Sequence, residues 1–340
     1  MRLLVLGGGG FLGHHTVTQG LAAGHDVTVL SRSGKPPVEG VEVLVGDRTG
    51  DLSALRSSVQ GGREWDGVVD TYTDTRPDAP AVEATARLLS GSVGGYAYVS
   101  GMSVYAPSGP RVPDESGPVR RAGVEPDTDV LQERSLAKLA GEAAVTEHFA
   151  GPALFPRVGI MVGPRDPSQR FTWWPVRLAG AAAGTLPRTV LLPGDPDRAV
   201  QYSDARDIAG WVVQMLATGR GGTFNTVGPG RGDTLRQVVD ACLAAAGARP
   251  DDVELVPVAD ERYLETALAD WEQEERPLWY PEDQIPQDAI DSSAALAAGL
   301  LFRSATDSAA ETLAWARENE AAGLTDSFVE REQQLWRGMP

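Results

Sequence analysis

The sequence predicts an α/β protein built on a doubly wound parallel sheet, with helices on both faces and a second, smaller domain. Two observations lead to this prediction. Through the first 160 residues, short apolar stretches alternate with amphipathic helical stretches, which is typical of parallel sheets covered on both faces. Beyond residue 160 the alternation is interrupted by 163–200, which is rich in Pro, Gly, Trp and Arg. That change indicates a second architecture.

The predicted elements follow in chain order. Apolar runs predict strands over residues 3–6, 26–30, 41–45, 67–70, 96–100 and 153–160, because each run is short and bounded by glycine or polar residues. Helical spacing of apolar residues predicts helices over 11–24, 81–90 and 136–149, the first ending on a glycine. Farther along, the same signals predict helices over 203–216 and 233–247 and strands over 223–228 and 253–258.

Charge and composition exclude several classes of protein. The net charge is −17, and residues 251–340 hold 21 Asp and Glu against 6 Arg. Such an acidic chain without a basic cluster does not suit nucleic-acid binding. No apolar segment reaches membrane-spanning length, and no signal peptide is recognisable at the start. The single cysteine, Cys242, excludes a disulfide framework. We therefore expect a cytoplasmic protein without nucleic-acid or membrane partners.

A glycine-rich loop joins the first predicted strand to the first predicted helix. In LGGGGFLGHH (6–15) the spacing is GxxGxxG, formed by Gly7, Gly10 and Gly13 with Phe11 and Leu12 between the last two. Glycines allow a tight turn and a close approach of the backbone to a pyrophosphate. The helix start offers unpaired N–H groups and a favourable dipole. The loop therefore predicts a dinucleotide-binding site.

The second predicted strand ends in residues that indicate the cofactor. Sites selective for NAD usually carry an acidic residue there to bind the ribose 2′-hydroxyl. This chain instead has two hydroxyls and two cations, namely Ser31, Arg32, Ser33 and Lys35. These groups suit a 2′-phosphate, so we expect NADP(H). Only two lysines occur in the chain, Lys35 and Lys138, and both fall where a dinucleotide would need a cation.

Four stretches together resemble the short-chain dehydrogenase/reductase superfamily, in its extended or atypical branch of NAD-dependent epimerase/dehydratase-like proteins. They are GGGGFLG, VSGMSVYAP (99–107), the helix with Lys138, and SDARDIA (203–209). The resemblance implies a Rossmann NADP-binding domain over 1–162 and 198–228. It also implies a substrate-binding domain over 163–197 and 229–340, with a lid around 260–290. By the same resemblance, Asp47, Arg48 and Thr71 belong to the cofactor site and Lys138 binds the nicotinamide ribose.

The departures from this pattern concern proton transfer. The family places a Tyr four residues before the Lys, and Arg134 stands there. The catalytic hydroxyl of the family falls on Gly101, flanked by Ser100 and Ser103. A guanidinium with a pKa above about 12 cannot act as an acid at neutral pH. The catalytic candidates are therefore Ser100, Ser103 and Lys138, with the proton supplied by the substrate or by water.

We expect an NADPH-dependent ketoreductase that reduces an aromatic polyketide ketone, angucyclinone-like, in antibiotic biosynthesis. A phenol beside the ketone would bring its own proton. Aromatic side chains and one methionine form the predicted pocket, although core packing is the alternative for each Trp. The predicted substrate-binding residues are Tyr72, Met102, Tyr105, Phe171, Trp173, Trp174, Tyr202 and Trp279.

Two other functions remain open. A non-catalytic NADP(H) sensor or scaffold would also lack the Tyr and the Ser, but it would not need Lys138 or an aromatic lid. A sugar-nucleotide epimerase or dehydratase oxidises its substrate first and needs a base, which Arg134 cannot supply. NADPH oxidation with a hydroxylated quinone would separate the first two functions, and a bound UDP-sugar would favour the third. The chain is expected to be a monomer or a homodimer.

Overall fold

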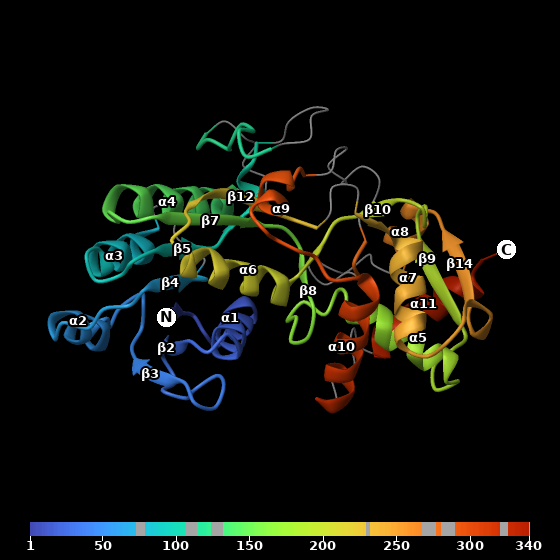
Figure 1. Ribbon diagram of the computed structural model, residues 1–340. Coiled ribbons are helices and arrows are strands. Elements are labelled where there is room, and N and C mark those ends of the chain that lie inside the picture. Colours follow the sequence, from blue (N-terminus) through green and yellow to red (C-terminus); the bar gives the residue numbers. More distant parts are fainter. Residues whose placement is uncertain are drawn as a thin grey trace. The chain divides into compact units, whose positions relative to one another are not determined.

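The computed structural model describes residues 1–72, 79–106, 114–123, 132–228, 232–266, 277–279, 290–319 and 326–339. Contacts divide the chain into two units (Figure 1). Unit 1 comprises Met1–Gly159, Ala205–Val227 and Ile290–Leu301. Unit 2 comprises Ile160–Asp204, Gly228–Ala289 and Phe302–Pro340. Within the described residues, no helix is both long enough and apolar enough to cross a membrane.

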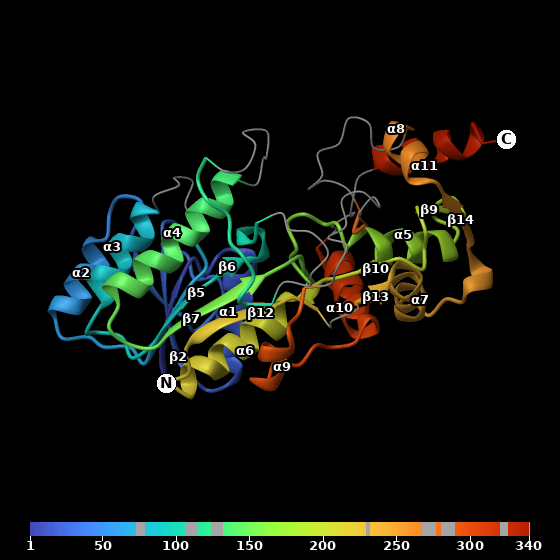
Figure 2. The same cartoon turned by 90° about the horizontal axis from the view of Figure 1, so that it is seen from above.

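Unit 1 is built on one parallel sheet (Figures 1 and 2). Its strand order is β12-β7-β5-β4-β1-β2-β3, and β6 pairs with β7. Crossover connections therefore run in both directions from β1, and the chain is doubly wound. The strands are β1 (Arg2–Leu6), β2 (Asp26–Ser31), β3 (Glu42–Val45), β4 (Gly67–Asp70), β5 (Tyr96–Tyr98), β6 (Ser100–Gly101), β7 (Ala153–Val158) and β12 (Gly222–Thr226).

Helices cover both faces of this sheet. Helices α1 (Phe11–Ala22) and α6 (Ala205–Ala217) pack together, as do α3 (Pro80–Leu89) and α4 (Gln132–His148). Along β1, Leu4 and Leu6 belong to a core cluster with Val82 of α3 and Val145 of α4, whereas Leu3 lies beside Gly20 of α1. This alternation is the period-2 pattern of a buried strand. Helices α2 (Ser53–Gln60) and α9 (Ser293–Ala297) and a 3₁₀ turn, Met102–Val104, also belong to unit 1.

The described part of unit 2 combines helices with three small strand pairs. Strands β9 (Thr189–Pro193) and β14 (Glu254–Val258) pair in parallel, as do β8 (Met161–Val162) and β11 (Ser203–Asp204). Strands β10 (Ala199–Val200) and β13 (Asp233–Thr234) are antiparallel. Helices α5, α7 and α10 contact one another, and α11 contacts β9. The helices are α5 (Trp173–Ala182), α7 (Leu235–Ala245), α8 (Asp260–Thr266), α10 (Ala305–Glu318) and α11 (Asp326–Arg337), with a 3₁₀ turn at Pro250–Asp252.

The predicted fold class is confirmed, and several details differ. The stretch 163–200, for which no element was predicted, contains α5 and β9, and Trp173, Trp174 and Leu178 are buried on α5. The predicted strand 96–100 is divided into β5 and β6, and α2 was not predicted. Residues 198–204 lie in unit 2 and 290–301 in unit 1, whereas the predicted boundaries place each in the other domain. Residues 290–301 join unit 1 because α9 packs beside β12. Most of the predicted lid, 260–290, lies outside the described residues.

Candidate functional site

The loop between β1 and α1 forms a cradle that a side chain would fill. Gly7 has a φ of 97°, a conformation that favours glycine, and the Gly10 amide donates to its carbonyl at 3.0 Å. A Cβ on Gly13 would lie 2.1 Å from the Gly7 oxygen, so no other residue fits there. Gly10 caps α1 without a side-chain hydrogen bond, and the helix therefore presents free N–H groups toward an anion. This geometry fits a pyrophosphate.

The residues between these glycines have structural roles. Leu12 is buried, and the Phe11 ring stacks edge-on with His15, the ring centroids 5.4 Å apart. Thr71, directly after β4, donates from its hydroxyl to the Leu6 carbonyl at 3.1 Å. A Cβ on Gly7 would lie 2.5 Å from that hydroxyl oxygen. Thr71 therefore fixes the floor of the cradle from the neighbouring strand.

The end of β2 carries the residues predicted to select the cofactor. The hydroxyls of Ser31 and Ser33 lie 3.1 Å apart, and the Lys35 amide donates to Ser33. Arg32, Ser33 and Lys35 are exposed, so their side chains are accessible to an anionic ligand. The pKa of Asp47 is lowered, first by hydrogen bonds from Thr49 and then by the Arg32 charge. The structure thus brings Arg32 within electrostatic reach of Asp47.

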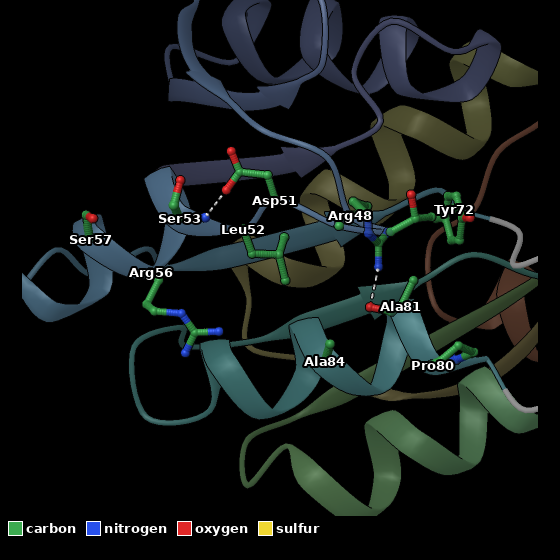
Figure 3. Close-up of a pocket in the computed structure, with 12 residues that line it drawn as sticks. Arg48, Asp51, Leu52, Ser53, Arg56, Ser57, Tyr72, Pro80, Ala81 and Ala84 are labelled. Atoms are coloured by element: carbon green, nitrogen blue, oxygen red, sulfur yellow. Dashed lines mark hydrogen bonds between the residues drawn. The ribbon is translucent and has the colours of Figure 1, made fainter.

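A cavity of about 880 Å³ opens between α2 and α3 (Figure 3). Arg48 lies beside it, with the guanidinium 4.8 Å from the centre of the Tyr72 ring. Both terminal nitrogens of Arg48 donate to the carboxylate of Asp70, and one also donates to Thr85 at 2.9 Å. The predicted cofactor residue Arg48 is therefore held rigidly by a buried ion pair. The cavity is lined by Arg48, Thr49, Gly50, Asp51, Leu52, Ser53, Arg56, Ser57, Tyr72, Pro80, Ala81 and Ala84.

Lys138 reaches the carboxyl ends of β4 and β5 from α4. Its ammonium donates to the carbonyls of Val99 at 2.7 Å and Tyr72 at 3.1 Å, and it lies 4.9 Å from the centre of the Tyr98 ring. Only 5% of the residue is exposed. Burial lowers the pKa of Lys138 to about 7. Arg134, four residues earlier on the helix, is exposed.

The three predicted site residues next to Gly101, namely Ser100, Met102 and Ser103, differ in their surroundings. Ser100 is 1% exposed, and its hydroxyl has no hydrogen-bond partner within the described residues. Ser103 is partly exposed, and its carbonyl accepts from the Arg120 side chain at 2.8 Å. Met102 is also partly exposed, and its sulfur lies 3.0 Å from the position of a Cβ on Gly159. Ser100 is therefore the hydroxyl nearest in the chain to the Lys138 contact at Val99.

Tyr105 belongs to a buried network. Its hydroxyl donates to Asn225 of β12 at 2.6 Å and accepts from Arg157 of β7 at 3.1 Å. Arg157 also forms a two-pronged ion pair with Glu142 of α4, at 3.0 and 2.8 Å. This predicted substrate residue thus ties the 3₁₀ turn to two strands and a helix. The residues Asp70, Tyr98, Glu142 and Arg157 were not predicted; a buried acidic residue at the end of β4 was the only sequence signal for any of them.

The predicted aromatic residues of unit 2 lie in its core. Trp173 packs against Phe328, the ring centroids 4.4 Å apart, and Phe171 against Tyr202 at 5.6 Å. Trp174 donates from its indole nitrogen to the Leu278 carbonyl at 3.1 Å. The Tyr202 hydroxyl donates to Asp233 at 2.7 Å. Phe171, Trp173, Trp174, Tyr202 and Trp279 all belong to one core cluster, and core packing accounts for them.

No family model matches the chain. A segment of 80 residues, 23% of this chain, is 39% identical to UDP-glucose 4-epimerase 4 of Oryza sativa subsp. japonica. The match covers 21% of that protein, so the chain spans about a fifth of the length of the curated relative it matches.

Three solved structures share the architecture over 93% of this chain. The UDP-N-acetylglucosamine 4-epimerase of Bacillus cereus has a TM-score of 0.64, 17% identity and 96% of its own chain covered. The UDP-glucose 4-epimerase of Thermus thermophilus, in complex with NAD, has a TM-score of 0.60 and 21% identity, with 99% of its own chain covered. The Bordetella bronchiseptica enzyme WbmH, in complex with NAD⁺, has a TM-score of 0.65 and 16% identity, with 98% of its own chain covered. These likenesses establish the fold.

Proposed function

We propose that this chain is a nicotinamide-dinucleotide-dependent oxidoreductase that interconverts a hydroxyl-bearing carbon and a carbonyl on a sugar nucleotide. The observation that carries the proposal is the cradle at Gly7 and Gly13, where a side chain is excluded and helix N–H groups are free. When bound, the dinucleotide would accept or supply the hydride. Gly10 and Gly13 would hold its pyrophosphate, and the cavity beside Arg48 and Tyr72 would hold its adenine end.

NADP(H) is the form of the dinucleotide that the residues after β2 favour. Arg32 and Lys35 are exposed cations beside two hydroxyls, a set that suits a phosphate through charge-assisted hydrogen bonds. The similar solved structures include complexes with NAD, so the 2′-phosphate is a proposal for this chain's own residues.

The sugar nucleotide is proposed from the similar proteins. The rice protein and two of the solved structures are named as UDP-sugar 4-epimerases. The aromatic side chains that suggested a flat substrate are core residues of unit 2, which removes most of the argument for a polyketide pocket. A sugar nucleotide is therefore the substrate class to test first.

An aromatic ketone remains a second candidate because of one observation. Arg134 occupies the place of the usual proton donor, and a ketone beside a phenol would supply its own proton. An NADPH-dependent reductase of aromatic polyketides, as in antibiotic biosynthesis, would have such a substrate.

The test is spectroscopic and covers both substrate classes. The purified chain is incubated with NADP⁺ or NADPH and with UDP-glucose, UDP-N-acetylglucosamine or a quinone with a hydroxyl beside the carbonyl. Reduced cofactor formed from a UDP-sugar supports the main proposal, and oxidation of NADPH by the quinone alone supports the second. A protein that binds NADPH tightly and transfers no hydride with any of them would be a sensor or scaffold, which contradicts both.

A further inference from the structure

Lys138 is a buried cation without a carboxylate partner among the described residues. Its three donor hydrogens have two acceptors in the structure, the neutral carbonyls of Val99 and Tyr72. An ammonium buried in this way has lost its hydration and gained no opposite charge in direct contact. Two carboxylates act on it electrostatically, those of Asp70 and Glu142, and their hydrogen bonds explain why neither pairs with it.

Asp70 is saturated by other donors. Its two oxygens accept from both terminal nitrogens of Arg48, from the Tyr96 hydroxyl at 2.7 Å and from the Tyr72 amide at 3.0 Å. The residue is 0% exposed, so its charge is largely neutralised by Arg48. The last of these contacts holds the backbone of Tyr72, whose carbonyl is one of the two acceptors of Lys138.

Glu142 is engaged in the same manner on the other side. Its two oxygens accept from Arg157 at 3.0 and 2.8 Å, and both side chains are nearly buried, with 12% and 8% exposed. Within the described residues, two arginine–carboxylate pairs therefore flank Lys138 and leave it as the unpaired cation. Arg134 adds a further positive charge from the preceding turn of α4.

The consequence is a lysine that loses its proton easily. Burial lowers the pKa of Lys138 to about 7, Asp70 and Glu142 partly oppose this effect, and Arg134 and Arg48 add to it. The aromatic ring of Tyr98 is a polarisable group in contact with the ammonium, at 4.9 Å from its centre. An amine with a pKa near neutrality can both accept and donate a proton there.

The position suits this role. The two carbonyls that hold Lys138 lie just beyond the carboxyl ends of β4 and β5, which are neighbours in the parallel sheet. Ligands of open α/β sheets bind outside these strand ends. The hydroxyl of Ser100, the residue after Val99, is buried there without a partner among the described residues.

We propose that the Nζ atom of Lys138 exchanges the proton with the reacting oxygen of the substrate, at a site where Arg134 provides no acid. This inference rests on the proposed function. In oxidation, the neutral amine takes the hydroxyl proton while the carbon yields its hydride to the dinucleotide, leaving a carbonyl and an ammonium. In reduction, the ammonium returns that proton as the carbonyl carbon receives the hydride. Water restores the protonation state of Lys138 between turnovers.

A direct titration tests the lysine without any substrate. Because Lys35 and Lys138 are the only lysines, ¹⁵N-lysine labelling gives two Nζ resonances, which Lys138→Met assigns. We expect Lys138 to titrate at about pH 7. In Arg134→Gln the Lys138 midpoint should move upward by several tenths of a pH unit, since a nearby positive charge is removed. A Lys138 that stays protonated up to about pH 9 overturns the inference.

Kinetics then separate proton transfer from cofactor binding. Lys138→Arg keeps a cation but cannot release its proton, so kcat should fall by about 10²–10⁴-fold while the Kd for NADPH changes little. The pH midpoint of kcat should move upward in Arg134→Gln. It should not move in Glu147→Gln, an exposed change at the far end of the same helix, where 75% of the side chain is exposed.

The outcomes distinguish the two proposals. The role of Lys138 is overturned, and the proposed function left intact, if the wild type is active and Lys138→Arg keeps its kcat. The same holds if the pH midpoint of kcat does not move in Arg134→Gln. A wild type that binds NADPH and transfers no hydride to any substrate overturns both. Far-UV circular dichroism and the thermal midpoint of each variant show that a lost kcat is not a lost fold.

Discussion

At the scale of single residues, the phosphate cradle depends on one glycine more than on its neighbours. A Cβ on Gly13 would lie 2.1 Å from the Gly7 oxygen, whereas one on Gly9 would meet nothing within 4 Å. We expect Gly13→Ala to displace the loop and to lower NADPH affinity at least tenfold, and Gly9→Ala to leave it unchanged. Fluorescence titration with NADPH measures the affinity of both variants. Equal losses in the two variants would mean that steric exclusion at Gly13 is not the cause.

Arg32 should determine whether the chain prefers NADPH over NADH. A hydrogen bond to a charged group contributes about 1.5–3 kcal/mol, so Arg32→Ala should weaken NADPH binding by about tenfold or more and leave NADH binding unchanged. Arg2→Ala is the matched control, because Arg2 is also exposed, at 51% of its side chain, and lies at the amino end of β1. If Arg32→Ala weakens both cofactors equally, Arg32 does not bind the 2′-phosphate.

Lys138 also makes stability depend on pH. Its pKa is about 7 when folded and about 10.4 when unfolded. Between these values the unfolded chain binds a proton that the folded chain does not, so the free energy of unfolding rises with pH. Urea titrations between about pH 7 and 8.5 should show this increase in the wild type. In Lys138→Met the free energy of unfolding should rise less steeply, by up to about 1.4 kcal/mol per pH unit. Above that window the buried Cys242 thiol, whose pKa is raised by burial, opposes the effect. Parallel curves for the two proteins would contradict an uncharged Lys138.

At the scale of elements, α11 is anchored to α5 and β9 by one buried ion pair. Arg177 and Glu332 are both fully buried, with nitrogen and oxygen 2.7 Å apart, and Glu332 also accepts from the Leu191 amide at 3.0 Å. Glu332→Gln leaves a buried charge unpaired, so the free energy of unfolding should fall by about 3–5 kcal/mol. The exposed pair of Arg236 and Asp197, with 50% and 64% of the side chains exposed, is the control.

Denaturant unfolding measures the free energy of unfolding of Glu332→Gln and of the control variant Asp197→Asn. Asp197→Asn should change the free energy of unfolding by about 0–1 kcal/mol, because exposed pairs contribute little. A double change, Arg177→Met with Glu332→Leu, should recover most of the loss in Glu332→Gln, since no unpaired charge remains. If the double variant is as unstable as Glu332→Gln, geometry rather than charge holds α11.

The elements also show why some predictions succeeded. Strands β1, β2 and β4 are short apolar runs bounded by loops, and the strand–loop–helix order around Gly7 and Gly13 is local, so their pattern is visible in the sequence. Helix α5 was missed because Trp173, Trp174 and Pro175 at its start have no clear helical period. The same residues suit a core or a pocket, and only the partners Phe328 and Leu278, more than 100 residues away in the chain, decide for a core.

At the scale of the whole molecule, the sequence predicted the fold class and the glycine loop, but not what makes Lys138 unusual. Its environment depends on Arg48 and Arg157, which come from opposite sides of it in the chain and each bind a carboxylate. Such non-local pairing has no signature in spacing or periodicity. The candidate cofactor site and Lys138 as a candidate catalytic residue were therefore predictable, and the charged surroundings of Lys138 were not.

The two units should respond separately to perturbation, because each has its own hydrophobic core. Bound NADPH stabilises the folded state of the unit that holds it, and local opening follows cooperative units. In hydrogen–deuterium exchange we expect NADPH to slow β1, α1 and β4 of unit 1 and to leave β9 and α11 unchanged. Glu332→Gln should do the opposite, with faster exchange in α5, β9 and α11 and an unchanged Kd for NADPH. Faster exchange in both units of Glu332→Gln would show that they unfold as one cooperative body, because the pair it breaks lies entirely within unit 2.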